Sequence, residues 1–291
     1  MAQILPVDER PSGTFGWVSL WSATIDFPEM SDPTASTSLA IVLPAYNEAG
    51  RIEPALDELF GYLGRSAAPM GSMRVLVVDD GSVDGTADLV RARPEAHGDG
   101  DGPRLDVLTV PHGGKGAAVR AGMLAADADL IVFADADMAT PPDQLPLLIA
   151  ALAHADVALG SRIQVDGYDM RASQPAIRRA LGRVFHALAS AWVVGPVADT
   201  QCGFKGFRRA AAHDLFGRQQ VTSIVFDVEL IYLARRRGYR WTVVPIQWND
   251  RRGSRMHPGI GLALRVAWDL FRIPLLHRRV GRATTSSEPT T

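Results

Sequence analysis

The chain contains a single cysteine and no long hydrophobic run. Cys202 alone excludes an intrachain disulfide and any cysteine-based zinc cluster, and it fits a reducing compartment. No window reaches the roughly 20 uninterrupted apolar residues of a membrane span. The first ten residues hold acids and no apolar core, so we expect no signal peptide. Helix-turn-helix, zinc-finger and ribonucleoprotein motifs are also missing, and we expect no nucleic acid partner.

The charged residues are present in ordinary number but are unevenly distributed. The 291 residues are 47% hydrophobic and 21% charged, a balance typical of a globular protein with a full core. Residues 1–160 carry 9 Lys and Arg against 23 Asp and Glu, whereas residues 161–291 carry 21 against 9. We therefore expect the first part to hold a cation and the second to bind phosphates or an anionic lipid surface.

Short apolar runs alternate with segments of helical periodicity from residue 39 onward. This alternation predicts an α/β fold with a parallel sheet and helices on its faces. The predicted strands are 39–43, 74–78, 105–110, 130–134 and 157–160, and the predicted helices are 53–63, 86–93, 116–126 and 142–153. Ligands of such sheets bind beyond the carboxyl ends of the strands, so the loops that follow the strands are the expected site.

The loop after strand 130–134 contains Asp135 and Asp137, two carboxylates separated by one small residue. Such a pair can hold Mg2+ or Mn2+, which accepts few protein ligands and completes its shell with phosphate oxygens. An acidic turn is the alternative for this pattern taken alone. The polar loops after the other strands favour the metal site.

Three of these loops have a distinct character. The first reads Pro-Ala-Tyr-Asn-Glu at 44–48. The second carries the adjacent carboxylates Asp79 and Asp80, which repel each other unless donors or a cation compensate, whereas Asp84 is explained by capping of the next helix. The third, at 111–116, offers glycine amides, a lysine and a helix N-terminus, which are the components of an anion cradle, although Gly-Gly before a helix is often only a turn.

In this order the four loops resemble those of the family 2 inverting glycosyltransferases of the GT-A (Rossmann-like) fold. Further motifs resemble the polyprenyl-phosphate sugar synthases, dolichyl-phosphate β-glucosyltransferases in particular. They are Gly-Ser-Arg at 160–162, Asp-Thr-Gln-Cys-Gly-Phe-Lys-Gly-Phe at 199–207, Phe-Asp-Val-Glu at 226–229, Val-Pro-Ile-Gln-Trp at 244–248 and Gly-Ser-Arg at 253–255. The resemblance implies a mostly parallel sheet and a glycosyltransferase domain at 39–256.

The same resemblance implies roles for single residues. The nucleotide-sugar donor is expected to contact Pro44, Ala45, Tyr46, Glu48, Asp79, Asp80, Lys115, Gln201, Asp227 and Glu229. Asp135 and Asp137 are expected to hold the metal on the diphosphate, and both are counted as catalytic together with Asp199. The residues expected to line the sugar pocket are Asp199, Gln201, Asp227 and Glu229, and the alternative for each is a helix cap or an internal salt bridge. Mannosyl-type synthases often carry glutamine where this chain has Ala139, so the glucosyl type is favoured.

The acceptor is expected to be a lipid phosphate. Its second pKa is near about 6, so it is largely dianionic at neutral pH and needs guanidinium groups rather than a base. Arg162, Arg178 and Arg255 are the expected phosphate ligands, with Arg162 also counted as catalytic. The alternative for each is a solvated basic face. His112, His154 and His186 have no metal-site spacing and are expected to be structural.

The expected reaction is transfer of glucose from UDP-glucose to a polyprenyl phosphate, with inversion and with Mg2+ or Mn2+. The alternatives are the same chemistry with GDP-mannose, a family 2 transferase acting on a hydroxyl with Asp199 or Asp227 as its base, and a nucleotide-sugar sensor without turnover. Each keeps the donor loops described above.

The segments outside this domain are interpreted from their own composition. Residues 1–38 are expected to be a disordered or loosely docked leader, and 281–291 a disordered tail. Residues 257–280 form an expected amphipathic helix in a membrane interface, with 176–194 of similar character. Attachment to the cytoplasmic face of a membrane follows. The alternative is packing on the domain core or on a second subunit, which would make a homodimer.

Overall fold

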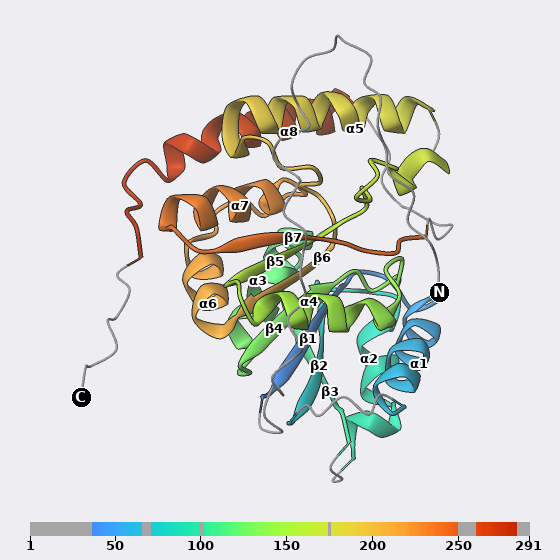
Figure 1. Cartoon of the computed structure of the whole chain (residues 1–291). Helices are drawn as coiled ribbons and strands as arrows, with labels where there is room; N and C mark the ends of the chain where they lie inside the picture. The colour runs from blue at the N-terminus through green and yellow to red at the C-terminus, as the bar shows by residue number, and fades with distance from the viewer. Residues whose placement is uncertain (1–36, 66–70, 99–101, 174–175, 250–259, 284–291) are drawn as a thin grey trace, which may run out of the picture. The chain divides into compact units, whose positions relative to one another are not determined.

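A mixed sheet forms the centre of the computed structural model, which describes residues 37–65, 71–98, 102–173, 176–249 and 260–283. Within these ranges the sheet has seven strands in the order β3-β2-β1-β4-β6-β5-β7 (Figure 1). Their bounds are β1 Leu39–Ala45, β2 Met73–Asp79, β3 Arg104–Thr109, β4 Leu130–Ala134, β5 Val157–Ser161, β6 Phe204–Arg208 and β7 Trp241–Pro245.

Strand direction determines which loops meet. β1 pairs in parallel with β2 and β4, and β5 pairs in parallel with β7, whereas β6 runs antiparallel between β4 and β5. The last residue of β4, Ala134, therefore pairs with Phe204, the first residue of β6. As a result, the segment before β6 lies at the same edge as the carboxyl ends of β1, β2, β4 and β5.

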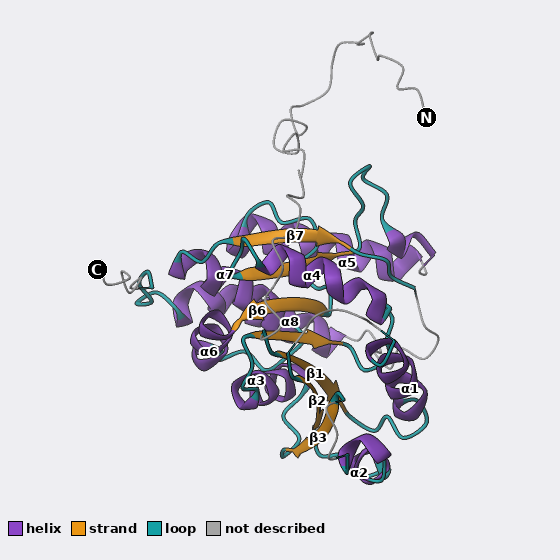
Figure 2. Cartoon of the chain, turned by 60° about the horizontal axis from the view of Figure 1, so that its bottom comes forward, coloured by secondary structure: helices purple, strands orange, loops and turns teal. Residues whose placement is uncertain are grey.

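Helices cover both faces of this sheet, as the alternation predicts (Figure 2). Side chains of β4 alternate between two hydrophobic cores, with Phe133 in one and Val132 in the other. The first core contains side chains of α3, α6 and α7, and the second contains those of α1, α2 and α4. The helices are α1 Ile52–Leu63, α2 Thr86–Arg91, α3 Lys115–Ala125, α4 Leu145–Leu152, α5 Ala176–Ala189, α6 Arg209–Arg218, α7 Phe226–Arg237 and α8 Ile260–Leu276.

The predicted elements are present, with shifted ends. Helix 86–93 ends at Arg91 because Pro94 follows and opens a short 3-10 turn. Helix 142–153 begins with a 3-10 turn at Pro142–Gln144 before α4. The helix expected at 176–194 becomes a π-helix at Ser190–Val194. β6, β7, α6 and α7 were not predicted as elements.

α8 has a buried side and an exposed apolar side. Leu270 and Ile273 are buried in the core that also contains side chains of α7, whereas Trp268 and Phe271 remain about half exposed, at 62% and 48%. Trp192, on the π-helical segment, stacks on Phe271 with ring centroids 5.9 Å apart. Among the described helices, none is long and apolar enough to cross a membrane.

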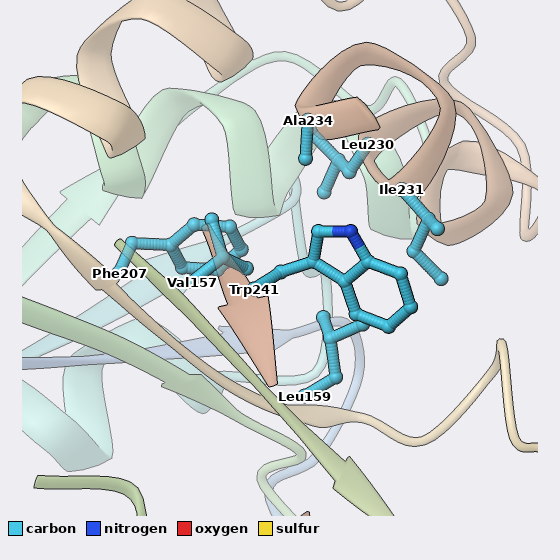
Figure 3. A pocket seen from close by; sticks show the side chains of 7 residues that line it. All are labelled: Val157, Leu159, Phe207, Leu230, Ile231, Ala234 and Trp241. Atoms are coloured by element: carbon cyan, nitrogen blue, oxygen red, sulfur yellow. The ribbon is translucent and has the colours of Figure 1, made fainter. Parts of the chain in front are cut away.

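A small hollow near the starts of β5 and β7 is lined only by apolar side chains (Figure 3). The indole of Trp241 points into it from β7, opposite Leu230, Ile231 and Ala234 of α7. These positions lie at the strand ends remote from the acidic loops. This apolar lining offers a charged nucleotide no polar or charged partner.

Candidate functional site at the carboxyl edge of the sheet

The loops after β1 and β2 are fastened to each other. The N–H of Asn47 donates to Ser82 Oγ at 2.8 Å, and that of Val83 donates to Asn47 Oδ1 at 2.9 Å. Asn47 has a φ of 53°, a left-handed conformation that asparagine tolerates better than most residues. The two loops therefore form one rigid wall of the edge.

Asp80 binds the loop after β3. Its buried carboxylate accepts the N–H groups of Gly113 at 2.8 Å and Gly114 at 2.9 Å, and His112 Nδ1 lies 2.9 Å from Oδ2. These are the amides in which the sequence suggested an anion cradle. That interpretation is corrected in one respect: the anion in the cradle is the carboxylate of Asp80 itself.

An aromatic pair stands exposed beside this contact. The rings of Tyr46 and His112 stack with centroids 4.2 Å apart and an angle of 24° between their planes. Tyr46 is 41% exposed, so the pair presents a flat surface of the kind on which a nucleobase stacks. His112 was read as structural from the sequence. Its position directly after a strand was the signal that could have marked it.

The Asp-x-Asp loop meets a lysine. Lys115, the first residue of α3, lies with Nζ 2.5 Å from Asp135 Oδ1. Burial opposes the charge of Lys115, but the carboxylates of Asp135 and Asp227 outweigh this effect and raise its pKa. Met138 follows Asp137 with a φ of 49°, an uncommon conformation that turns the chain sharply after the second aspartate.

Asp137 has the character of a cation ligand. Its Oδ1 accepts the N–H of Ala139 at 3.0 Å. Burial and the charge of Asp135 raise the pKa of Asp137 above its ordinary value. A divalent cation would relieve this repulsion, and carboxylate oxygens suit Mg2+ and Mn2+. Within the described ranges no third His, Cys, Asp or Glu joins them, so the remaining ligands would have to be phosphate or water oxygens.

The segment before β6 packs closely against Asp135. The N–H of Asp135 donates to the carbonyl of Gly203 at 3.1 Å. A Cβ on Gly203 would overlap the carboxylate of Asp135. This glycine was not singled out from the sequence beyond its place in a motif, because the contact joins residues far apart in the chain.

Arg162 and Asp199 form a fork-like ion pair. The Nε and Nη2 groups of Arg162 donate to the two carboxylate oxygens at 2.7 and 2.8 Å, and its backbone N–H donates at 3.1 Å. Burial would raise the pKa of Asp199, but Arg162 outweighs it and holds that pKa far below the usual range. The guanidinium also lies 5.8 Å from the ring centroid of Trp248. A carboxylate held in this way is a weak base.

A second ion pair is wholly buried beneath the site. Lys205 Nζ lies 2.6 Å from Asp227 Oδ1 and donates to the carbonyl of Cys202 at 2.5 Å. Burial raises the pKa of Asp227 despite this partner. Burial and the charge of Asp199 likewise raise the pKa of the Cys202 thiol to about 12, so it stays protonated at neutral pH.

The remaining predicted residues lie in different surroundings. Glu48 pairs with Arg51 at 2.6 Å, and Asp79 is buried and accepts the N–H of Ser82 at 3.3 Å. The N–H of Gln201 donates to Asp199 at 3.3 Å. Pro44 and Ala45 end β1 at this edge.

The sugar-pocket prediction is not supported for Glu229. Its carboxylate is fully buried and binds three internal donors, which is the internal salt bridge given as the alternative. Asp227 likewise has an internal partner, although its charge acts on Lys115. Arg178 is part of α5, and Arg255 lies outside the described residues.

The segments at the two ends of the chain are described only in part. Residues 1–36 and 284–291 lie outside the described ranges. Ala283, expected in the tail, donates its N–H to the carbonyl of Arg237 at 2.8 Å, so the folded part continues at least to this residue.

Comparison with known proteins identifies the family. The model of Glycosyl transferase family 2 matches residues 40–216. A dolichyl-phosphate beta-glucosyltransferase of Trichomonas vaginalis is 37% identical over 263 residues, covering 87% of this chain and 75% of that protein. The Drosophila melanogaster protein of the same name is 36% identical, covering 86% and 78%. The human one is 33% identical, covering 76% and 70%.

Solved structures agree on the fold. Glucosyl-3-phosphoglycerate synthase from Mycobacterium tuberculosis, in complex with Mn2+, UDP and glucosyl-3-phosphoglycerate, aligns with a TM-score of 0.52 at 18% identity over 86% of this chain and 82% of that one. Mannosyl-3-phosphoglycerate synthase from Rubrobacter xylanophilus aligns with a TM-score of 0.56 at 20% identity, over 88% and 78%. With its loops gathered at one edge of a GT-A sheet, this chain is an enzyme that belongs to glycosyl transferase family 2.

Proposed function

We propose that the chain transfers glucose from UDP-glucose to a polyprenyl phosphate such as dolichyl phosphate, with inversion at the anomeric carbon. The observation that carries this proposal is the gathering of Asp135, Asp137 and Lys115 at the same edge of the sheet as the Tyr46–His112 pair. It occurs in a chain whose relatives of 33–37% identity are named dolichyl-phosphate beta-glucosyltransferases.

The donor would lie along this edge, and different side chains would contact its base and its diphosphate. The uracil would stack on Tyr46, whose ring is exposed. Mg2+ or Mn2+ would be held by Asp135 and Asp137, where it would supply Lewis-acid stabilisation of the leaving diphosphate. Lys115, already paired with Asp135, adds a fixed positive charge at the same place.

The acceptor phosphate would react from the opposite face of the sugar. One of its oxygens forms the bond to the anomeric carbon while the bond from that carbon to the diphosphate oxygen breaks, and the electron pair leaves with UDP. No proton has to be removed because the phosphate is already ionised. Arg162 would attract it, and Asp199 would hold the guanidinium in place rather than act as a base. Arg178 and Arg255 remain proposed further ligands of the acceptor.

The membrane would be met by the exposed apolar surface of α5, the π-helical segment and α8. Its large side chains are Val184, Leu188, Trp192, Leu264, Trp268, Phe271 and Leu275. Exposed arginines stand on the same helices, including Arg183 and Arg265. Apolar side chains with basic neighbours suit the interface of an anionic leaflet, so we propose peripheral attachment at the cytoplasmic face. A second copy of the chain on this surface is the alternative.

The activity is tested with purified chain, dolichyl phosphate in detergent, Mn2+ or Mg2+, and UDP-glucose labelled in the sugar. We expect label in a lipid product that mild acid releases, with β configuration at the anomeric carbon. Preference for GDP-mannose would overturn the sugar assignment, and an acid-stable glycoside would overturn the phosphate acceptor. Binding of UDP without any turnover would indicate a sensor.

The metal role is tested with Asp137→Asn. The amide cannot replace a carboxylate ligand of a divalent cation, so kcat should fall by at least about 100-fold. The melting temperature without metal should change little, because the variant also removes repulsion from Asp135. Retention of wild-type turnover in the variant would refute the metal site.

The membrane surface is tested by co-sedimentation with vesicles that contain phosphatidylserine. Trp268→Ser combined with Leu264→Ser should reduce the bound fraction several-fold, since each buried apolar side chain contributes roughly 1.5–3 kcal/mol. Leu147→Ser is the matched control, because Leu147 is an exposed leucine on α4 at 37%. Unchanged vesicle binding combined with a change from dimer to monomer would favour the second-copy alternative.

A further inference from the structure

Glu229, near the start of α7, joins two elements outside the donor site. Its carboxylate accepts the N–H groups of Gln220 and Val221, each at 2.9 Å. His277 Nε2 lies 2.6 Å from the same carboxylate. Glu229 and His277 are 0% and 1% exposed. Glu229 therefore ties the α6–α7 connection, residues 219–225, to the carboxyl end of α8.

The α6–α7 connection in turn holds the first turn of α3. The carbonyl of Thr222 accepts the N–H of Gly116 at 3.0 Å, and the side-chain amide of Gln219 donates to the carbonyl of Gly116 at 2.9 Å. A Cβ on Gly116 would stand 2.7 Å from the Thr222 oxygen, so the two backbones are in direct contact. Gly116 follows Lys115, whose amino group meets Asp135.

α8 reaches the same connection at a second point. Ser223 Oγ donates to Asp269 Oδ2 at 2.5 Å, and Asp269 also pairs with Arg272 at 2.8 Å. Asp269 is 4% exposed, and the neighbouring Leu270 and Ile273 are buried in the core. The buried side of α8 therefore supports the connection in two ways. Asp269 accepts a hydrogen bond from Ser223, and His277, directly after the helix, contacts Glu229.

We propose that Glu229 and His277 are positioning residues of the donor site. Through the α6–α7 connection they fix the first turn of α3, and with it the place at which Lys115 meets Asp135. This inference rests on the proposed function, because it assigns the donor diphosphate to that place. It also makes α8, the helix proposed to contact the membrane, a support of the donor site.

The test compares variants by their affinity for UDP with Mn2+ in calorimetry and by their KM values for UDP-glucose and dolichyl phosphate. In Glu229→Gln an NH2 group, which can only donate hydrogen bonds, replaces a carboxylate oxygen that accepts them. We expect the UDP dissociation constant and the KM for UDP-glucose to rise about 3- to 30-fold, with the KM for dolichyl phosphate unchanged. His277→Ala should act in the same direction, and His277→Gln, which keeps an N–H donor, should largely restore the affinity.

Arg236→Ala is the matched control. Arg236 donates to the carbonyls of Val280 and Arg278, so it fixes the same end of α8 without touching the α6–α7 connection, and UDP affinity should stay at the wild-type value. Should Glu229→Gln fail to fold, Ser223→Ala removes only the second contact and should give a smaller rise.

Three results would overturn the inference: equal shifts of both KM values, variants that lower only the melting temperature, or an Arg236→Ala shift as large as that of Glu229→Gln. Wild-type chain that binds UDP but transfers no sugar would instead overturn the proposed function, because the comparison of UDP affinities would still stand.

Discussion

Gly203 shows how a single residue limits the geometry of the site. The space that its Cβ would fill is occupied by the carboxylate of Asp135. Its backbone does not adopt a left-handed conformation, so glycine is required here for space alone. Asp135 is held from the other side by Lys115, which leaves the carboxylate little freedom to move away.

Gly203→Ala should therefore reduce kcat/KM with UDP-glucose by about 100-fold, because displacing a group of the site by about 1 Å has an effect of this size. Gly217→Ala is the control. Gly217 lies in α6 with no other atom within 4 Å of an added Cβ, so this variant should keep its activity and gain about 0.5–1 kcal/mol of unfolding free energy. Steady-state kinetics and urea unfolding measure both effects, and equal activity of the two variants would exclude the steric argument.

Asp199 provides a test of its pairing with Arg162 through pH. Asp199→Asn should lower the free energy of unfolding by about 3 kcal/mol at pH 7, because it leaves a mostly buried guanidinium, 13% exposed, without its counter-ion. The pKa of Asp199 is depressed in the folded state, so its stabilisation is present above the unfolded pKa of about 3.9 and is lost as the pH falls below it.

Urea unfolding at several pH values measures this difference. The advantage of the wild type over Asp199→Asn should be constant from pH 7 to about 5 and should shrink towards pH 3. A difference that does not depend on pH would show that Asp199 is not an ionised partner of Arg162.

At the scale of elements, β6 and α7 are joined by the Lys205–Asp227 pair. Removing one partner of a buried pair leaves an uncompensated charge, so Lys205→Met should lower the free energy of unfolding by about 3–5 kcal/mol. Lys205→Met together with Asp227→Leu should recover at least roughly half of that loss, since apolar replacement of a whole pair is often neutral. Urea unfolding of the three variants gives the coupling energy, and additive losses would exclude the pair as a unit.

The same pair explains which elements the sequence could predict. β1 to β5 were found because apolar runs between turn residues are typical of buried parallel strands. β6 reads Phe-Lys-Gly-Phe-Arg, and its lysine belongs inside only because Asp227, 22 positions later, neutralises it. The two residues meet only in the folded chain, so the sequence around β6 does not predict a strand.

The sequence likewise predicts only part of the candidate site. The loops that meet at the carboxyl edge follow from strand order, whereas the direction of each carboxylate does not. Asp80 turns to the amides of Gly113 and Gly114, which lie 33 and 34 positions away, and Glu229 turns to His277 at a separation of 48. Local sequence contains no record of such partners, which is why Glu229 was placed in the sugar pocket, whereas a contact of Asp80 with the nucleotide stays a prediction.

At the scale of the whole molecule, the proposed donor site combines residues from the two oppositely charged parts of the chain. Asp135 and Asp137 belong to the acidic first 160 residues, whereas Gly203 and Arg162 belong to the basic remainder. β6 brings them together because it lies between β4 and β5. Ligands of this edge should therefore stabilise the folded chain as a unit rather than one part of it.

Thermal unfolding tests this expectation. Mn2+ alone meets two carboxylates that Lys115 already partly neutralises, and UDP alone meets the negative charge that Lys115 leaves on Asp135 and Asp137, so each should bind weakly. When both are bound, the phosphate oxygens of UDP would complete the coordination shell of Mn2+, and Mn2+ would neutralise the two carboxylates. At about 100 times the dissociation constant, the pair should stabilise the fold by about 2.7 kcal/mol and raise Tm by roughly 5–10 °C in a single transition, more than the sum of the separate shifts. Asp137→Asn should abolish the excess over that sum. Additive shifts in the wild type would show that the metal and the nucleotide do not share this site.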